Sequence, residues 1–108
     1  MSTAPIRLHA PPPFELWLVA LADAAPGADI GLLDEQERER AARFVFERDR
    51  RRYVGAHVAL RQLLGRRLGR PPGALRFESG AFGKPRLLGE PSCAFSLSHS
   101  GDKALVAL

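Results

Sequence analysis

The sequence predicts an α+β domain in which a long helix packs on a small antiparallel sheet. The prediction depends on a short apolar segment at 14–21, a long amphipathic segment at 49–68, and several short β-rich segments beyond residue 75. With a shorter helix after the first strand, the order along the chain is one strand, two helices and three strands. At 108 residues the chain can form one hydrophobic core but not two.

The first strand is expected at 14–21, after an extended lead-in at residues 1–13 that ends in three consecutive prolines. Every residue of this segment except Glu15 is apolar, which is typical of a strand that contributes to a core. We expect Phe14, Leu16 and Leu18 to share one face.

The first helix is expected to begin after Asp34 and to run to about Phe46. Asp34 is a good N-cap residue, and Glu37 stands three positions later, where a capping box requires an acidic or amide side chain. The inner stripe of this otherwise polar helix would consist of Ala41, Phe44 and Val45.

A second, longer helix is expected over residues 49–68. Apolar residues recur there at steps of three and four, which indicates one buried stripe. Arg50–Arg52 fall in the first turn, where cations oppose the helix dipole and a nearby anion would relieve the repulsion. His57 is interpreted as a packing or surface residue. The stripe consists of Tyr53, Ala56, Leu60, Leu64 and Leu68.

Strands are expected to follow the second helix, which Gly69 and a Pro-Pro-Gly segment bring to an end. The β-rich segments lie at 75–77, 93–98 and 104–108. Gly101-Asp102 is a suitable turn for a hairpin between the last two of them.

The composition is typical of a soluble globular protein, with 45% hydrophobic and 26% charged residues. The longest apolar run, at 14–21, is too short to span a bilayer, and the N-terminus lacks the apolar core of a signal peptide. A single cysteine, Cys93, excludes an internal disulfide and a cysteine-based zinc cluster. We therefore expect a cytoplasmic protein that has no membrane partner.

The positive charge is concentrated in one part of the chain. Residues 38–70 hold eleven arginines against three acids, a local charge of +8, whereas the whole chain carries +4. Such a field favours an anionic partner: a nucleic acid, an acidic protein or a phosphate-rich small molecule. Arginine outnumbers lysine fourteen to two, however, and a GC-rich genome alone can produce that bias.

A small basic nucleic-acid-binding domain is therefore the alternative function. That alternative favours aromatic side chains interleaved with the basic ones on the surface. Phe44, Phe46 and Tyr53 instead fall near the apolar stripes and are expected in the core.

Two segments carry the groups most suited to chemistry. Residues 95–101 place a histidine among serines at a strand end, and residues 80–85 form a Gly-rich turn with one lysine. Ser98 and His99 are not expected to form a catalytic pair, because neighbouring strand residues point to opposite faces. The turn lacks the spacing of a phosphate-binding P-loop, but its backbone can approach a ligand closely and Lys84 offers a charge. The two segments therefore favour binding of a polyphosphate.

Four segments, in their order and spacing, resemble the N-terminal half of Sfp-type 4′-phosphopantetheinyl transferases. The resemblance covers about residue 14 to the end, so residues 14–108 would be the N-terminal subdomain and 1–13 a lead-in. The segments are Asp34-x-x-Glu37-Arg38-x-Arg40-x-x-Arg43-Phe44, Asp49-Arg50-Arg51-Arg52-Tyr53-x-x-x-His57-x-x-Leu60-Arg61, Phe82-Gly83-Lys84-Pro85 and Phe95-Ser96-Leu97-Ser98-His99-Ser100-Gly101.

The resemblance implies a function and a set of ligand contacts. Such enzymes move phosphopantetheine from coenzyme A to a serine of an acyl, peptidyl or aryl carrier protein, and coenzyme A lies between two similar α+β halves. Arg52 and His99 would contact the 3′-phosphate of coenzyme A. The other coenzyme A-binding residues implied are Arg40, Gly83, Lys84, Pro85 and Ser98.

The sequence also departs from the family. Glu37 stands where some relatives carry a lysine, and Ser96 where asparagine is common. The family's metal-binding carboxylates, in G-x-D-x-E and W-x-x-K-E segments, are absent. We therefore interpret the chain as a truncated half of a transferase that binds coenzyme A but is inactive alone. Mg²⁺ is expected only with the missing C-terminal half, and the face left uncovered would pair with that half or with a second copy.

Overall fold

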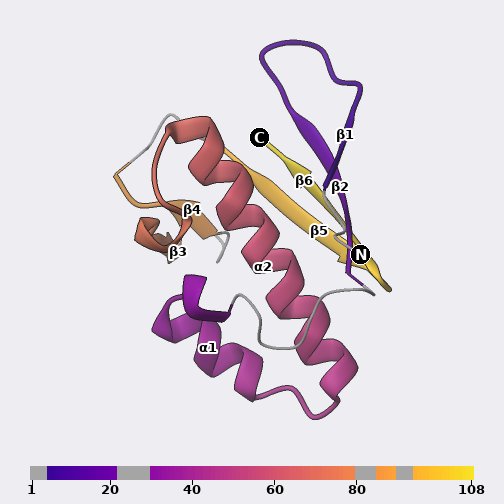
Figure 1. Ribbon diagram of the computed structural model, residues 1–108, viewed down its shortest axis with the longest axis vertical. Helices are drawn as coiled ribbons and strands as arrows, with labels where there is room; N and C mark the ends of the chain where they lie inside the picture. Colours follow the sequence, from indigo (N-terminus) through magenta and orange to yellow (C-terminus); the bar gives the residue numbers. More distant parts are fainter. Residues whose placement is uncertain (1–4, 22–29, 80–84, 90–93) are drawn as a thin grey trace.

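The structure is a computed structural model that describes residues 5–21, 30–79, 85–89 and 94–108. A long helix, α2 (Glu47–Leu68), crosses the molecule between an antiparallel sheet on one side and the shorter helix α1 (Glu35–Ala42) on the other (Figure 1). The predicted α+β architecture, with a long helix on a small antiparallel sheet, is confirmed.

The strands form two antiparallel sheets. The larger has four strands in the order β1-β2-β6-β5, and the smaller pairs β3 with β4. Short 3-10 helices, η1 (Ile30–Leu32) and η2 (Pro72–Ala74), precede α1 and β3. The strands are β1 (Ile6–Leu8), β2 (Leu16–Ala20), β3 (Phe77–Ser79), β4 (Pro85–Leu87), β5 (Ser96–Ser100) and β6 (Lys103–Ala107).

The lead-in is thus partly a strand, because β1 lies within residues 1–13 and pairs with β2. The predicted hairpin turn is confirmed between β5 and β6, where Gly101 adopts a left-handed conformation with φ of 59°. Cys93 lies outside the described residues. Among the described residues, no helix is both long and apolar enough to cross a membrane.

Helix α1 begins as predicted and ends earlier. The Asp34 side chain accepts a hydrogen bond from the Glu37 backbone N–H at 2.9 Å, and the Glu37 side chain accepts one from the Asp34 backbone at 3.0 Å. The helix stops at Ala42, so the prediction that it continues to Phe46 is wrong. The three aromatic and β-branched residues at 44–46 have low helix propensity and form the connection to α2 instead.

This early end removes two residues from the expected inner stripe. Ala41 is buried, but Phe44 is 37% exposed and Val45 is 89% exposed. Phe46, also expected in the core, is 66% exposed, whereas Tyr53 is buried as predicted.

Helix α2 packs on two sides. Toward the sheet it presents four of the five residues of the predicted stripe: Ala56, Leu60 and Leu64 are almost completely buried and Leu68 is partly buried, whereas Tyr53 packs on the other side. A second cluster, which contains α2 residues Tyr53, Val54 and Val58, packs against Leu33 and Ala41 from the α1 side. Because both sides are covered, α2 holds the two parts of the domain together.

In β2, Leu16 and Leu18 share one face as expected, but the opposite face is the one buried in the core. Trp17, Val19 and Leu21 are buried, whereas Leu16 and Leu18 are half-buried and Phe14 is 61% exposed. The cause is the register with β6, which places Trp17 opposite the fully buried Val106.

The other side of the large sheet, here called the outer sheet face, is also apolar. Leu18 pairs with both Ile6 and Leu105, and all three share this face because paired residues of antiparallel strands point the same way. Ile6 is 61% exposed and Leu105 is 37% exposed. The face also carries Leu8, Leu16 and Ala107, and on β5 Ser96, Ser98 and Ser100.

Candidate functional site

A groove with a volume of about 850 Å³ is lined by residues of α1, the first half of α2, β3 and β5. We call it the basic groove after its arginine and histidine side chains, Arg40, Arg43, His57 and His99, and the carboxylates Asp34, Glu37 and Glu39 line it as well. Its lining is Asp34, Gln36, Glu37, Glu39, Arg40, Arg43, Phe44, Tyr53, His57, Leu60, Phe77, Phe95, Ser96, Leu97 and His99. A second hollow of about 660 Å³ lies near the start of α1 and carries Arg38 and Arg76, both of which donate to backbone carbonyls.

Each basic residue of the groove is placed by a local feature. The capping box fixes the start of α1, and Arg40 follows in its last turn. Arg43 is the C-cap of the same helix. His57 projects from the middle of α2. Because side chains alternate between the two faces of a strand, His99 points toward α2, as Leu97 does.

Several arginines near the basic groove have no acidic partner among the described residues, whereas Arg50 and Arg51 pair with Glu47. Among the described residues, Arg40, Arg43, Arg48 and Arg52 make no hydrogen bond, ion pair or ring contact through their side chains. Unpaired guanidinium groups around a groove repel one another, and an anion in the groove would relieve this repulsion.

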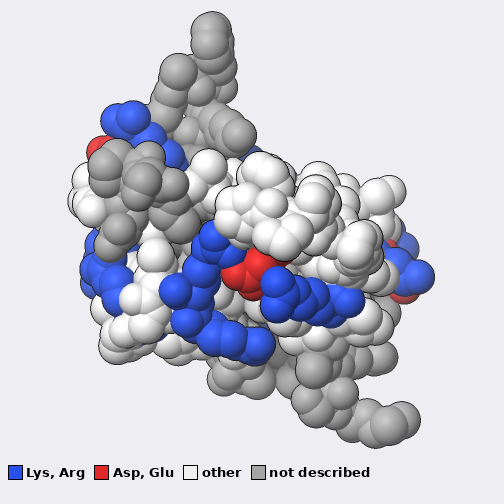
Figure 2. All heavy atoms as spheres, turned by 90° about the horizontal axis from the view of Figure 1, so that it is seen from above, with Lys and Arg blue, Asp and Glu red and all other residues white. Residues whose placement is uncertain are grey.

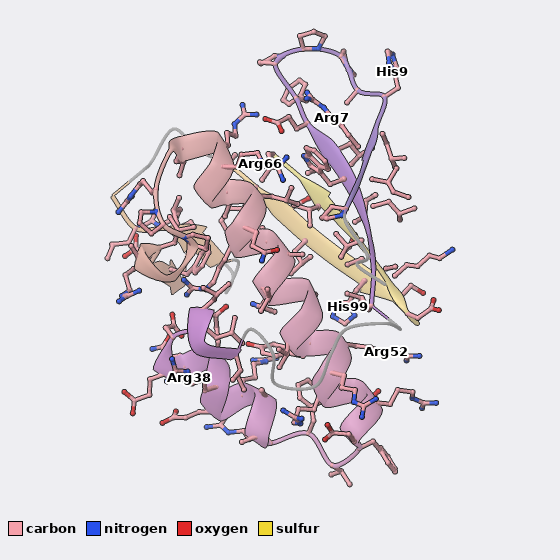
Figure 3. All side chains as sticks on the ribbon, viewed as in Figure 1. Arg7, His9, Arg38, Arg52, Arg66 and His99 are labelled. Atoms are coloured by element: carbon pink, nitrogen blue, oxygen red, sulfur yellow. The ribbon has the colours of Figure 1, made fainter. Side chains whose placement is uncertain are left out.

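Arginines elsewhere are satisfied within the protein. At the C-terminal end of α2, Arg7 and Arg66 lie over the Trp17 ring, and Arg67 forms an ion pair with Glu15. Figure 2, which looks down on this end, shows basic side chains grouped around an acidic one. Figure 3 shows Arg7 and Arg66 there, far from Arg52 and His99. The unsatisfied positive charge is therefore concentrated toward the basic groove.

The structure brings some of the predicted ligand residues together. Arg40 and His99 both line the basic groove. Arg52 does not line it, but it follows Arg51 on α2 directly before the lining residue Tyr53, and its side chain is half-buried. In Figure 3 it extends on the same side of α2 as His99.

Other predicted ligand residues are not brought to the groove. Ser98 lies on the outer sheet face, whereas the side chain of its neighbour His99 points to the other face of the sheet. Ser98 therefore does not line the groove. Pro85 begins β4, where its backbone pairs with Ser79. Gly83 and Lys84 lie outside the described residues.

A cluster of buried polar side chains around Arg61 lies next to the basic groove. Arg61, which is 0% exposed, donates through Nε to Glu37 Oε1 at 2.8 Å and through a terminal nitrogen to Asp34 Oδ2 at 3.1 Å. Its other terminal nitrogen donates to the carbonyls of Pro72 and Leu75 at 3.0 and 2.8 Å. The guanidinium thus ties α1, α2 and η2 together.

Glu37 is the centre of this cluster. Its Oε2 lies 3.0 Å from His57 Nδ1, while Oε1 receives bonds from Arg61 and from the Asp34 backbone. Burial alone would raise the pKa of Glu37, but the hydrogen bonds from His57, Arg61 and the Asp34 backbone lower it to about 2. Burial, together with the charge of Glu37, raises the pKa of Tyr53 to about 12. Glu37 is therefore ionised and Tyr53 neutral at physiological pH.

Three rings, those of Phe44, Tyr53 and His57, form a row along the groove wall. Phe44 lies 5.4 Å from Tyr53, and Tyr53 lies 4.1 Å from the His57 ring in a stacked arrangement. The interpretation of His57 as a packing residue is therefore confirmed. Glu37 faces inward as a structural carboxylate.

Sequence reasoning missed the Arg61 cluster. A signal was present, because Arg61 stands four residues after His57 and eight after Tyr53, and all three therefore share one side of α2. A single arginine between Leu60 and Leu63 in a buried helix requires a carboxylate partner.

Comparison with known proteins identifies the family. The sequence model described as "4′-phosphopantetheinyl transferase, N-terminal" matches residues 27–108. The chain is 40% identical over 79 residues to the "4′-phosphopantetheinyl transferase HetI" of Nostoc sp., covering 70% of this chain and 33% of that protein. It is 31% identical over 96 residues to the human "L-aminoadipate-semialdehyde dehydrogenase-phosphopantetheinyl transferase", covering 84% of this chain and 28% of that one.

A third relative, the "Phosphopantetheinyl transferase" of Thraustochytrium sp., is 33% identical over 101 residues, covering 85% of this chain and 34% of that protein. The chain thus spans about a third of the length of these relatives. Neither the family match nor these relatives give support to the nucleic-acid-binding alternative. With residues 27–108 matched, the chain belongs to the 4′-phosphopantetheinyl transferase family and corresponds to its N-terminal domain.

Proposed function

We propose that this chain is the coenzyme A-binding part of a cytoplasmic enzyme that transfers phosphopantetheine from coenzyme A to a serine of an acyl, peptidyl or aryl carrier protein. The observation that carries the proposal is that the unpaired arginines Arg40 and Arg43 line a groove that also contains His99, with the unpaired Arg52 next to its lining residue Tyr53. Coenzyme A bears a diphosphate and a 3′-phosphate, and such groups are bound best by guanidinium and imidazolium donors.

The proposal assigns the 3′-phosphate to Arg52 and His99 and a further phosphate contact to Arg40. Arg40 and His99 line one groove, and Arg52 is unpaired next to it, which supports this assignment. Gly83, Lys84, Pro85 and Ser98 are proposed contacts from the family resemblance, with Ser98 reached from the outer sheet face.

Magnesium does not fit the described residues. Among them, no group of three or more histidine, cysteine, aspartate or glutamate side chains is arranged to hold a metal ion. We propose that the carboxylates for Mg²⁺ belong to the C-terminal part of the enzyme, and that this chain alone binds coenzyme A without transferring phosphopantetheine.

Calorimetric titration tests the coenzyme A site. The wild-type chain is expected to bind coenzyme A more tightly than 3′-dephospho-coenzyme A. Arg52→Ala should weaken coenzyme A binding about ten- to hundredfold, because a charge-assisted hydrogen bond contributes roughly 1.5–3 kcal/mol. Arg48→Ala is the matched control, since Arg48 is equally unpaired but lies one turn earlier in α2. Equal affinity of the wild-type chain for both ligands would contradict the assignment of Arg52 and His99.

The outer sheet face supports a proposal about partners. We propose that the C-terminal part of the enzyme covers it, because the relatives are about three times as long as this chain and Leu105 and Ile6 are exposed there. Without that part, the face is available to a second copy.

The chain alone is therefore expected to self-associate through this face. Leu105→Asp should weaken association at least tenfold, because a carboxylate would be buried in an apolar contact. Sedimentation velocity over a range of concentrations measures the effect, and Gln62→Asp, on the exposed side of α2, is the control. A wild-type chain that stays monomeric at high concentration would contradict the prediction.

A further inference from the structure

His57 packs against its neighbours and is also accessible from the basic groove. Its ring lines the basic groove, its side chain is 25% exposed, and Nδ1 lies 3.0 Å from Glu37 Oε2. Glu37, with its low pKa, is ionised at neutral pH, and an ionised carboxylate can only accept hydrogen bonds. Nδ1 must therefore carry the hydrogen. In the neutral ring, Nε2 is then left with a free lone pair, and it has no hydrogen-bond partner among the described residues.

The orientation of this ring is fixed before any ligand arrives. One face stacks on Tyr53 with ring centroids 4.1 Å apart, and the Nδ1 edge is held by Glu37. Glu37 is itself held by the fully buried Arg61 and by the Asp34 backbone. A carboxylate that accepts a hydrogen bond from one imidazole nitrogen fixes the tautomer of the ring and the direction in which the second nitrogen points. The same arrangement orients histidine in many catalytic and metal-binding sites.

The charges around His57 are mixed. From α1 and its two caps, Asp34, Glu37 and Glu39 contribute negative charge, and Arg40 and Arg43 contribute positive charge. From α2, Arg61 contributes positive charge and Tyr53 is neutral, and from β5 the titratable group is His99. The arginines of the groove repel a further positive charge, and its three carboxylates attract one. A phosphate group would shift this balance toward an imidazolium.

We propose that His57 is a further ligand-contacting residue of the basic groove, and that binding of a phosphate oxyanion there is coupled to proton uptake at its Nε2. The proposal rests on the proposed function and deepens it. On binding, Nε2 takes one proton from the solvent, the ring changes from neutral to singly positive, and the new N–H donates to a phosphate oxygen. Nδ1–H stays bonded to Glu37 throughout, so the ring does not have to turn.

The coupling predicts a pH dependence. Because the complex holds more protons than the free components, coenzyme A binding should weaken as pH rises from about 6 to 8, by at most tenfold per pH unit for one proton. At pH 6, His57→Gln should weaken binding about tenfold, since the charge-assisted hydrogen bond is lost, and at pH 8 the variant and the wild type should be nearly equal.

The experiment uses the three histidines of the chain, which can be replaced one at a time. Calorimetric titration with coenzyme A, in two buffers of different ionisation enthalpy at pH 7, gives the number of protons taken up by wild type, His57→Gln, His99→Gln and His9→Gln. His9 is exposed and lies outside the groove, so its replacement is the matched control. His57→Gln should remove a measurable part of the proton uptake, and His9→Gln none. ¹⁵N NMR of the free protein should show the Nδ1–H tautomer of His57.

The outcomes separate this proposal from the proposed function. If wild type binds coenzyme A and depends on Arg52, while His57→Gln binds equally well with unchanged proton uptake, only the role of His57 is overturned. An Nε2–H tautomer in the free protein would overturn it as well. If wild type binds neither coenzyme A nor inorganic pyrophosphate, both proposals fail. Pyrophosphate binding alone, with proton uptake lost in His57→Gln, upholds His57 as an oxyanion contact and overturns the choice of coenzyme A.

Discussion

Arg61→Met is expected to destabilise the domain by about 3–5 kcal/mol, because it would leave the buried carboxylates of Glu37 and Asp34 without their cation. The guanidinium makes contacts with both acids and with two backbone carbonyls, and it is completely buried. Methionine fills similar volume but satisfies none of these groups. Since domains of this size are stable by roughly 5–15 kcal/mol, the loss is a large part of the total.

Urea denaturation followed by circular dichroism measures this effect. Arg48→Met, on the exposed side of α2, is the control and should change stability by less than about 0.5 kcal/mol. The double variant Arg61→Met with Glu37→Met should be more stable than Arg61→Met alone, because one unpaired charge is removed with its partner. A single variant as stable as wild type would show that the cluster does not hold α1 to α2.

The second large effect is a loss of stability in acid. The pKa of Glu37 is about 2 in the folded protein against 4.5 for the ordinary side chain. A lowered pKa means that ionised Glu37 stabilises the fold above about pH 4.5, and that this contribution is lost as pH falls from 4.5 toward 2. The shift corresponds to a contribution on the order of 3 kcal/mol.

Denaturation in urea at several pH values between 6 and 2 would reveal this contribution. Glu37→Gln should be less stable than wild type at pH 6 and should lose much of the pH dependence. Glu47, whose pKa is also lowered by Arg50 but which is fully exposed, provides the control variant Glu47→Gln, and its profile should follow wild type. Identical pH profiles for wild type and Glu37→Gln would contradict the prediction.

Features set by neighbouring residues could be predicted from the sequence. The capping box at Asp34, the apolar stripe of α2 and the glycine turn at Gly101 depend on local chemistry, and the structure confirms all three. The inner face of β2 could not be predicted in the same way, because both alternating sets of residues in this strand are apolar. Pairing with β6 decides between them, and its register involves residues almost ninety positions later in the chain, as in Trp17 with Val106.

In the candidate site, too, local features could be predicted from the sequence and long-range contacts could not. The arginine-rich helix start and His99 could be recognised from sequence, since charge and motif spacing are visible there. That Ser98 would face away from the groove follows only once the face of β5 toward α2 is known. The pairing of His57 with Glu37 joins positions twenty residues apart on different helices, and no local rule predicts it.

The position of β6 also affects the order in which the domain can fold. This strand lies between β2 and β5, yet it is formed by residues 103–107, whereas β2 ends at Ala20. Joining segments so distant costs loop-closure entropy before any contact compensates it, so contacts between α1 and α2 should precede completion of the sheet. During synthesis on the ribosome, the edge of β2 that pairs with β6 therefore stays unpaired until residues 103–107 have emerged.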